Sequence, residues 1–156
     1  MPEVIDSQKL IQQISVLRKN ISVLEKKLHE SEEKFRTLTV FSPVGIFLDD
    51  PEGNAIYLNN RCAELVGVPA ERALELNWVP YIHPDDRERV TTRWVQAFTN
   101  GAEFHEEYRW VHEDGSIVWT LGDIAPVKNN DNKVILYIGT LTDITAQKEA
   151  EKILHK

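Results

Sequence analysis

The sequence of 156 residues has little sulfur and no long apolar segment. It contains one cysteine, Cys62, and one methionine, and no apolar run approaches the roughly 18 residues of a membrane-spanning helix. A single cysteine excludes an internal disulfide framework and fits a reducing compartment. The N-terminus also lacks the pattern of a secretory signal peptide. We therefore expect a cytoplasmic protein, and we expect that the segment of this sequence makes no contact with a membrane.

Positive charge is scarce over most of the chain. Residues 37–145 carry eight Lys and Arg against seventeen Asp and Glu, whereas residues 1–36 carry seven against six. An acidic body repels phosphate groups, so we expect no binding of nucleic acid. The hydrophobic content of 42% and the charged content of 28% are typical of a folded globular domain and argue against a disordered chain.

The first 38 residues carry a regular apolar pattern. Apolar residues recur at alternating spacings of four and three, which is the heptad pattern of a coiled coil. Isoleucine at position a with leucine at position d favours a parallel two-stranded coil. We therefore predict that residues 1–38 form a dimerising helix. Its seam consists of Leu10, Ile14, Leu17, Ile21, Leu24 and Leu28.

The alternative for this segment is an amphipathic helix that folds onto its own domain. About 31 helical residues span about 46 Å, whereas a domain of about 105 residues is only about 34 Å across. Part of the apolar stripe would then project into water, where its exposure is unfavourable. A homodimer through a parallel coiled coil is therefore the preferred interpretation.

Beyond Leu38 the apolar spacing changes to that of short strands. Strands at 44–48 and 55–58 flank an acidic turn, 49–54, that contains proline and glycine, which predicts a hairpin. Short helices are predicted at 61–66 and after Pro69, and a longer amphipathic helix at 84–100. Three further strands, at 103–112, 116–127 and 134–142, complete an α+β domain with one five-stranded antiparallel sheet.

Motifs within this pattern resemble the PAS family with its C-terminal PAC segment. The order of the motifs along about 120 residues, from Glu32 to Ile153, makes the resemblance specific, although each motif alone is weak. The motifs are Asn59 through Leu65 and Gly67, Trp78 followed by Ile82-His83-Pro84-Asp85-Asp86, Glu107 through Trp110 with Asp114-Gly115 and Trp119, and the exit Asp143-Ile144-Thr145.

The resemblance implies a sensor rather than an enzyme. PAS domains respond to a small molecule, a redox state or light and pass the change through flanking helices to a kinase, a cyclase or another effector domain. It implies a sensor domain at 39–145 and the start of a C-terminal signalling helix at 146–156. The parent would be a histidine kinase of a two-component system or a cyclic-dinucleotide enzyme. This segment itself shows no catalytic constellation.

The exit motif is predicted to relay the signal. Asp143 or Thr145 can cap the first free N–H groups of the following helix. A helix that is fixed to the last strand would turn when that strand shifts. We therefore expect Asp143, Ile144 and Thr145 to form the relay.

The same resemblance disfavours two cofactors. Trp78 occupies the position of the reactive cysteine of flavin-binding relatives, and Leu141 occupies that of their glutamine. The helix 84–100 holds no histidine, which is the usual iron ligand of haem-binding relatives. The spacing of the histidines indicates no metal site. The cofactor stays unassigned, and a domain without any cofactor fits the sequence as well.

The last strand offers the preferred place for a small-molecule ligand. Three of its residues share the face that corresponds to the cavity of the relatives, and a glycine among them leaves room. Two tryptophans are further candidates, although core packing explains such residues as readily. The candidate cavity therefore consists of Trp78, Trp94, Tyr137, Gly139 and Leu141. The alternative is a structural dimerisation and relay module whose cavity is filled by side chains.

Overall fold

The computed structural model describes residues 6–156, and the chain divides into two units at residues 39 and 40. The first unit is formed by one helix, α1 (Ser7–Val40). Asp6 precedes this helix, and its carboxylate accepts hydrogen bonds from the backbone N–H groups of Gln8 and Lys9 at 3.1 and 3.4 Å. Such an acceptor satisfies free donors of the first turn. The first five residues of the predicted segment 1–38 lie outside the described residues.

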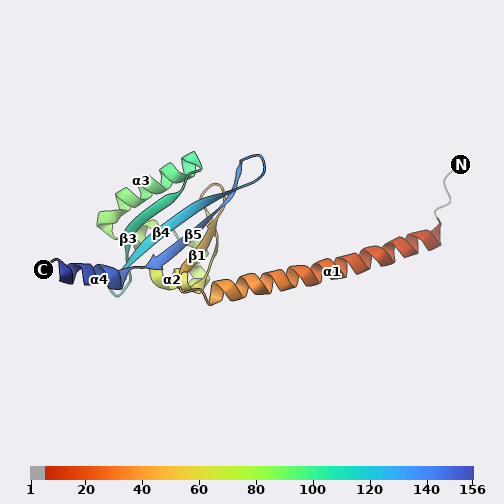
Figure 1. Ribbon diagram of the computed structural model, residues 1–156, viewed down its shortest axis with the longest axis horizontal. Coiled ribbons are helices and arrows are strands. Elements are labelled where there is room, and N and C mark those ends of the chain that lie inside the picture. The colour runs from red at the N-terminus through yellow and green to blue at the C-terminus, as the bar shows by residue number, and fades with distance from the viewer. Residues whose placement is uncertain (1–5) are drawn as a thin grey trace. The chain divides into compact units, whose positions relative to one another are not determined.

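The second unit is built on a five-stranded antiparallel sheet (Figure 1). The strands lie in the order β2-β1-β5-β4-β3, so the last strand is central and pairs with both the first and the fourth. The predicted α+β class with one five-stranded antiparallel sheet is confirmed. The strands are β1 (Gly45–Asp49), β2 (Ala55–Leu58), β3 (Phe104–Val111), β4 (Ile117–Lys128) and β5 (Val134–Asp143).

Helical segments connect β2 to β3 and follow β5. They are α2 (Asn60–Val66), the 3-10 turns η1 (Ala70–Glu75) and η2 (Val79–Tyr81), α3 (Pro84–Asn100) and, after the sheet, α4 (Thr145–Leu154). Among residues 6–156, no helix is both long and apolar enough to cross a membrane. The proposed boundaries between residues 38 and 39 and between residues 145 and 146 stay predictions.

Asn59 fixes the junction between β1 and α2. Its Oδ1 accepts hydrogen bonds from the N–H of Cys62, in the first turn of α2, and from the N–H of Ile46. Its Nδ2 donates to the carbonyl of Val44 at 3.1 Å. At the other end of α2, Gly67 adopts a φ of 87°, which ends the helix in the left-handed region that favours glycine. These contacts hold α2 against the inner face of the sheet.

The hydrophobic core lies on the face of the sheet that α2 and α3 cover. Alternation along β3 points Phe104, Tyr108 and Trp110 to this face, and all three are buried. The Trp110 indole N–H donates to the hydroxyl of Thr120, so its polar atom is satisfied within the core. This inner face contains the cavity described next.

Candidate functional site

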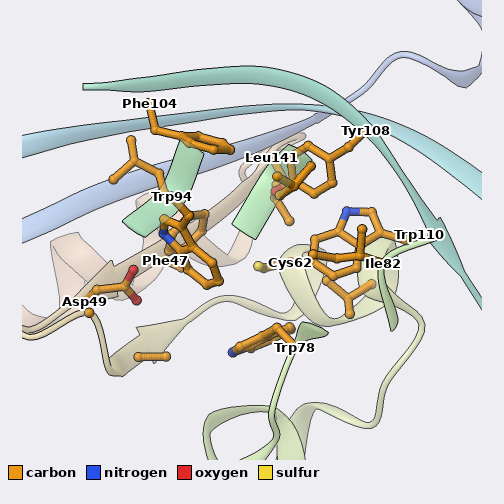
Figure 2. A pocket seen from close by; sticks show the side chains of 15 residues that line it. Phe47, Asp49, Cys62, Trp78, Ile82, Trp94, Phe104, Tyr108, Trp110 and Leu141 are labelled. Carbon is orange, nitrogen blue, oxygen red and sulfur yellow. The ribbon is translucent and has the colours of Figure 1, made fainter. Parts of the chain in front are cut away.

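A cavity of about 50 Å³ lies in the core (Figure 2). One water molecule needs about 10–15 Å³, so the cavity has room for about three to five water-sized groups. Residues from β1, α2, α3 and all three C-terminal strands contribute to the wall, which is largely aromatic and aliphatic. The lining residues are Phe47, Asp49, Gly53, Ala55, Cys62, Val66, Trp78, Ile82, Val90, Trp94, Phe104, Tyr108, Trp110, Ile124 and Leu141.

The structure places three of the five candidate cavity residues in this wall, namely Trp78, Trp94 and Leu141. Tyr137 and Gly139 share the inner face of β5 with Leu141 but do not line the cavity. The Tyr137 hydroxyl donates to the carbonyl of Phe98 at 3.3 Å, and the two rings lie 4.3 Å apart. Contact of any of the five with a ligand stays a prediction.

The room beside Gly139 is filled by the ring of Phe47. The two residues are opposite each other in the pairing of β1 with β5, and a Cβ atom at Gly139 would overlap the Phe47 ring. The side chain of Phe47 therefore takes the space that the sequence suggested for a ligand. Phe47 itself lines the cavity, so the glycine shapes the cavity indirectly.

Asp49 is a wall residue that the sequence analysis missed, because it was assigned to the acidic turn. The structure places it at the end of β1, opposite Tyr137 and only 2% exposed. Its Oδ2 accepts no hydrogen bond from any described residue. Burial, together with the neighbouring charge of Asp50, raises the pKa of Asp49 from 3.8 to about 7. The alternation of Gly45, Phe47 and Asp49 on one strand face was the signal that could have found it.

Asp50 has the opposite environment, although it is the next residue. Its carboxylate accepts hydrogen bonds from the backbone N–H groups of Asn54 and Glu52, at 2.8 and 3.0 Å, and from the Asn54 side chain. These hydrogen bonds lower the pKa of Asp50. The predicted turn therefore begins one residue later than expected, at Asp50, because Asp49 still belongs to the strand.

Trp94 carries the second polar group of the wall that has no hydrogen-bond partner among the described residues. Its Nε1 is buried and donates to no acceptor in the part of the chain that the structure describes. Besides the tryptophans, the wall contains the polar side chains of Cys62 and Tyr108. Burial and the nearby Asp49 raise the pKa of Cys62 to about 12, and burial raises that of Tyr108 as well, so both stay protonated. Within residues 6–156, no three His, Cys, Asp or Glu side chains are grouped closely enough to hold a metal ion.

Asp86 joins α3 to β3 through a carboxylate whose two oxygens both accept hydrogen bonds. It is 5% exposed and accepts hydrogen bonds from the backbone N–H, Nε and Nη2 of Arg109, at 3.0, 2.9 and 2.9 Å. Burial alone would raise the pKa of Asp86, but the hydrogen bonds from Arg109 outweigh that effect and lower it. Glu106 adds two further contacts between the same elements, with Arg89 at 2.6 Å and Arg93 at 2.8 Å.

The exit motif is bonded to both β4 and α4. Asp143 Oδ1 accepts the N–H of Thr145 at 2.9 Å, so Asp143 satisfies a free donor at the start of α4. Thr145 does not cap the helix, because its hydroxyl accepts the backbone N–H of Trp119 at 3.0 Å. The carbonyl of Trp119 in turn accepts the N–H of Ile144 at 2.9 Å. A role of these three residues in signal relay stays a prediction.

Comparisons with known proteins agree with this geometry. The family model described as "PAS fold" matches residues 55–141, which is more than half of the chain. "Uncharacterized protein y4lL" of Sinorhizobium fredii is 31% identical over 80% of this chain and 15% of its own length. "Peroxide stress-activated histidine kinase mak1" of Schizosaccharomyces pombe is 29% identical over 73% of this chain and 7% of its own length. "Probable diguanylate cyclase DgcE" of Escherichia coli is 25% identical over 82% of this chain and 12% of its own length.

A solved structure shows the same fold. The PAS domain of a protein from Colwellia psychrerythraea matches with a TM-score of 0.61 and 24% identity, over 73% of this chain and 97% of that one. The present chain spans only about 7–15% of the length of the three curated relatives above, so its likeness to them covers a single domain. With the family model, the fold and the ordered motifs in agreement, the chain belongs to the PAS family of sensor domains.

Proposed function

We propose that this PAS domain dimerises through α1 and passes a change in its cavity to an output domain through α4. One observation carries the proposal: a continuous series of contacts joins the cavity wall to the first turns of α4. The series runs along α3 to Asp86, then through Arg109 of β3 and Trp119 of β4, and ends at Thr145 and Lys148 of α4. All of these residues lie within the unit 40–156.

The first part of the series joins the cavity to β3. Val90 and Trp94 line the cavity, and Asp86 lies one turn before Val90 on the same helix. Because Asp86 holds the guanidinium and the backbone of Arg109, a displacement of α3 is transmitted to β3 at this point. A helix is stiff over such a distance, so motion at Val90 reaches Asp86 with little loss.

The second part joins β3 to α4 around one indole ring. The Arg109 guanidinium carbon lies 5.0 Å from the centre of the Trp119 ring, and Lys148 Nζ lies 5.5 Å from it. Such cation–π contacts are favourable, although partly screened by solvent. The backbone of Trp119 holds Thr145 and Ile144 as described above. We propose that Asp143, Ile144 and Thr145 fix α4 to the sheet and that Trp119 sets its direction.

The apolar side of α1 supports a dimer. The six seam residues of this helix are each 42–63% exposed. Exposed leucine and isoleucine at heptad spacing are stabilised by a second copy of the same helix. We propose a parallel homodimeric coiled coil with the seam Leu10, Ile14, Leu17, Ile21, Leu24 and Leu28.

The dimer has a direct test in Leu24→Asp, which would bury a charge in the seam. Multi-angle light scattering should give the monomer mass for this variant. Ser22→Asp, at the outward heptad position b, is the matched control and should keep the dimer mass. A dimer of unchanged mass for Leu24→Asp would reject the coiled coil.

The effector is proposed from the relatives. PAS domains are sensor modules, and two of the relatives carry the names of a histidine kinase and a probable diguanylate cyclase. We propose that residues 39–145 sense, that residues 146–156 begin the signalling helix, and that catalysis lies in an effector domain of the parent protein. We further propose that this module acts in the cytoplasm.

The relay is tested by filling the cavity of a fusion protein. The chain is joined after Lys156 to the dimerisation and catalytic core of a histidine kinase, and autophosphorylation is measured. Val90→Phe adds atoms at the wall, pushes α3 outward and should change kinase activity severalfold in either direction. Val95→Phe, on the exposed side of the same helix (65% exposed), is the matched control and should change little.

The contact series predicts a second result for the same fusion protein. Thr145→Val removes the hydroxyl that accepts the Trp119 N–H, and it should suppress the effect of Val90→Phe while circular dichroism shows an intact fold. If Val90→Phe changes kinase activity equally in a protein that also carries Thr145→Val, the relay through Trp119 is rejected.

The small size of the cavity supports a second candidate, namely a dimerisation and relay module that binds no ligand. A cavity of about 50 Å³ is far below the roughly 300–1,000 Å³ of sites for drug-sized molecules. Native mass spectrometry of the freshly purified protein separates the two candidates. A retained small molecule favours the sensor, and bare protein mass favours the structural module.

A further inference from the structure

Two polar groups without partners occupy the wall of the cavity. Asp49 Oδ2 and Trp94 Nε1 are buried, and neither forms a hydrogen bond with any of residues 6–156. Buried polar atoms are satisfied in the great majority of cases, so two exceptions in one small cavity require an explanation. In Figure 2 both groups lie toward the same end of the cavity, opposite Trp110. One is an acceptor and the other a donor, so a single occupant with the complementary pair can satisfy both.

The wall favours a positively charged occupant. Asp49 is its only acidic residue, and its described lining residues include no Lys, Arg or His that could neutralise a carboxylate. The same wall presents the faces and edges of phenylalanine, tyrosine and tryptophan rings. Aromatic rings attract organic cations, most strongly where water is excluded. A carboxylate surrounded by aromatic rings is therefore complementary to an ammonium group.

We propose that the cavity binds a small organic cation whose ammonium group donates a hydrogen bond to Asp49 and whose oxygen accepts one from the Trp94 indole. This inference rests on the proposed sensor function, since it names the ligand class of the same cavity. The available volume limits the ligand to about four heavy atoms. The chemical class is thus a short amino alcohol or a close analogue.

We infer that a ligand enters the cavity beside the β1–β2 hairpin. The wall residues Gly53 and Ala55 of this hairpin are only half-buried, whereas Cys62, Val66 and Ile82 are fully buried. The acidic composition of the domain also raises the local concentration of cations near its surface.

The protonation of Asp49 follows from the same surroundings. The titratable groups that face it are Asp50 on the same hairpin, Cys62 on α2 and Tyr108 on β3. The two from α2 and β3 stay protonated, and α3 contributes no charged group to the wall. Because Asp49 has a pKa of about 7 in the empty cavity, binding of a cation should strengthen as the pH rises through 7 and should release a proton.

The experiment is a titration of ¹⁵N-labelled protein with ethanolamine hydrochloride, followed by the indole N–H signals in NMR. The Trp94 signal is the one that is lost in Trp94→Phe. Ethanolammonium should shift this signal downfield and saturate it, with a Kd on the order of 0.1–10 mM, as expected for so few atoms. Ethylene glycol and n-propylammonium have the same size. The first lacks the charge and the second lacks the oxygen, so each should bind more weakly by about tenfold or more.

Two matched variants locate the contact. Asp49→Asn removes the charge at constant shape and should weaken ethanolammonium binding by about 10- to 100-fold. Asp50→Asn changes the neighbouring carboxylate, which is engaged in the turn. At pH 8, where Asp49 is mostly ionised with or without the Asp50 charge, this variant should change the affinity far less than Asp49→Asn does. Equal affinity for ethylene glycol and ethanolammonium, or unchanged affinity in Asp49→Asn, would overturn the inference.

Water is the other possible occupant, and the same titration identifies it. If no probe produces a saturable shift of the Trp94 signal, the two groups are satisfied by water alone and the inference is wrong. The proposed relay is judged separately, because the response to Val90→Phe needs no ligand. Failure of the titration with a positive Val90→Phe result would reject the ligand class and keep the relay.

Discussion

Asp49 and Asp86 are both buried carboxylates, but they have opposite surroundings. Asp86, at the start of α3, accepts hydrogen bonds from the backbone and the guanidinium of Arg109, and its pKa is lowered. Asp49, at the end of β1, has an oxygen without a partner, and its pKa is raised to about 7. Burial is similar, at 5% and 2% exposed, so burial does not explain the difference.

The difference is that the fold provides hydrogen-bond donors to Asp86 and provides none to Asp49 Oδ2 among the described residues. Breaking a buried, bonded ion pair is strongly destabilising, so Asp86 belongs to the part of the domain that stabilises the fold. An unmatched carboxylate destabilises the fold and persists where an occupant or a task compensates for it. The region of Asp86 and Arg109 therefore stabilises the fold in addition to its proposed place in the relay, and the region of Asp49 and Trp94 is the place where binding is expected.

The largest effect is expected from Asp86→Asn. Asparagine presents an N–H₂ group toward the Arg109 donors and removes the charge, so we expect a loss of about 3–5 kcal/mol in the free energy of unfolding at pH 7. Urea denaturation followed by tryptophan fluorescence measures this loss. Because the folded pKa of Asp86 is lowered, its contribution is present above its unfolded pKa and is lost as the pH falls below about 4.

Asp85→Asn is the control for this substitution. The Asp85 side chain is 75% exposed and lies 3.9 Å from Arg109 Nη2, so its removal should cost much less than that of Asp86. Equal effects of the two substitutions would show that the bonds to Arg109 do not stabilise the fold, and the contrast between the two buried carboxylates would fail.

A smaller effect of opposite sign is expected from Asp49→Asn. The folded pKa of Asp49 is raised, so the folded protein keeps a proton that the unfolded chain releases between about pH 4 and 7. The wild type therefore loses stability as the pH rises through this interval, at about 1.4 kcal/mol per pH unit. Relative to the wild type, Asp49→Asn should become more stable by about 2–3 kcal/mol between pH 5 and pH 7. Urea denaturation at several pH values checks this.

Asp50→Asn provides the comparison within the same hairpin. Its carboxylate is engaged in the turn and its pKa is lowered, so the substitution should not reproduce the pH-dependent gain. A stability difference between the wild type and Asp49→Asn that stays constant from pH 5 to pH 8 would mean that Asp49 is ionised throughout, and the contrast with Asp86 would then be wrong.

The fold was predictable because its signals are local. Asp50 through Gly53 form a turn, Pro84 with the acidic first turn begins α3, and Gly67 ends α2, as the sequence indicates. The central place of the last strand was not predicted from the sequence. Pairing between residues about 90 positions apart leaves no local signal of its own.

The site was less predictable because it depends on packing between distant segments. Trp78 and Trp94 were candidates as large aromatic residues, and Leu141 was placed by resemblance. The cavity wall also includes Asp49, whose acidic neighbours made it look like part of a turn. The bonds of Arg109 to Asp86 and the position of Trp119 between Arg109 and Lys148 join four elements, and no spacing along the chain indicates them.

The contact between Phe47 and Gly139 has a consequence for the range of molecules that the domain can admit. The space over the glycine is occupied by the phenyl ring, and the same side chain lines the cavity. Rotation of that ring about its side-chain bonds would redistribute this space while every strand stays in register. The shape of the cavity thus depends on the rotamer of one side chain, and we expect a molecule of different shape to be accommodated by a change of that rotamer.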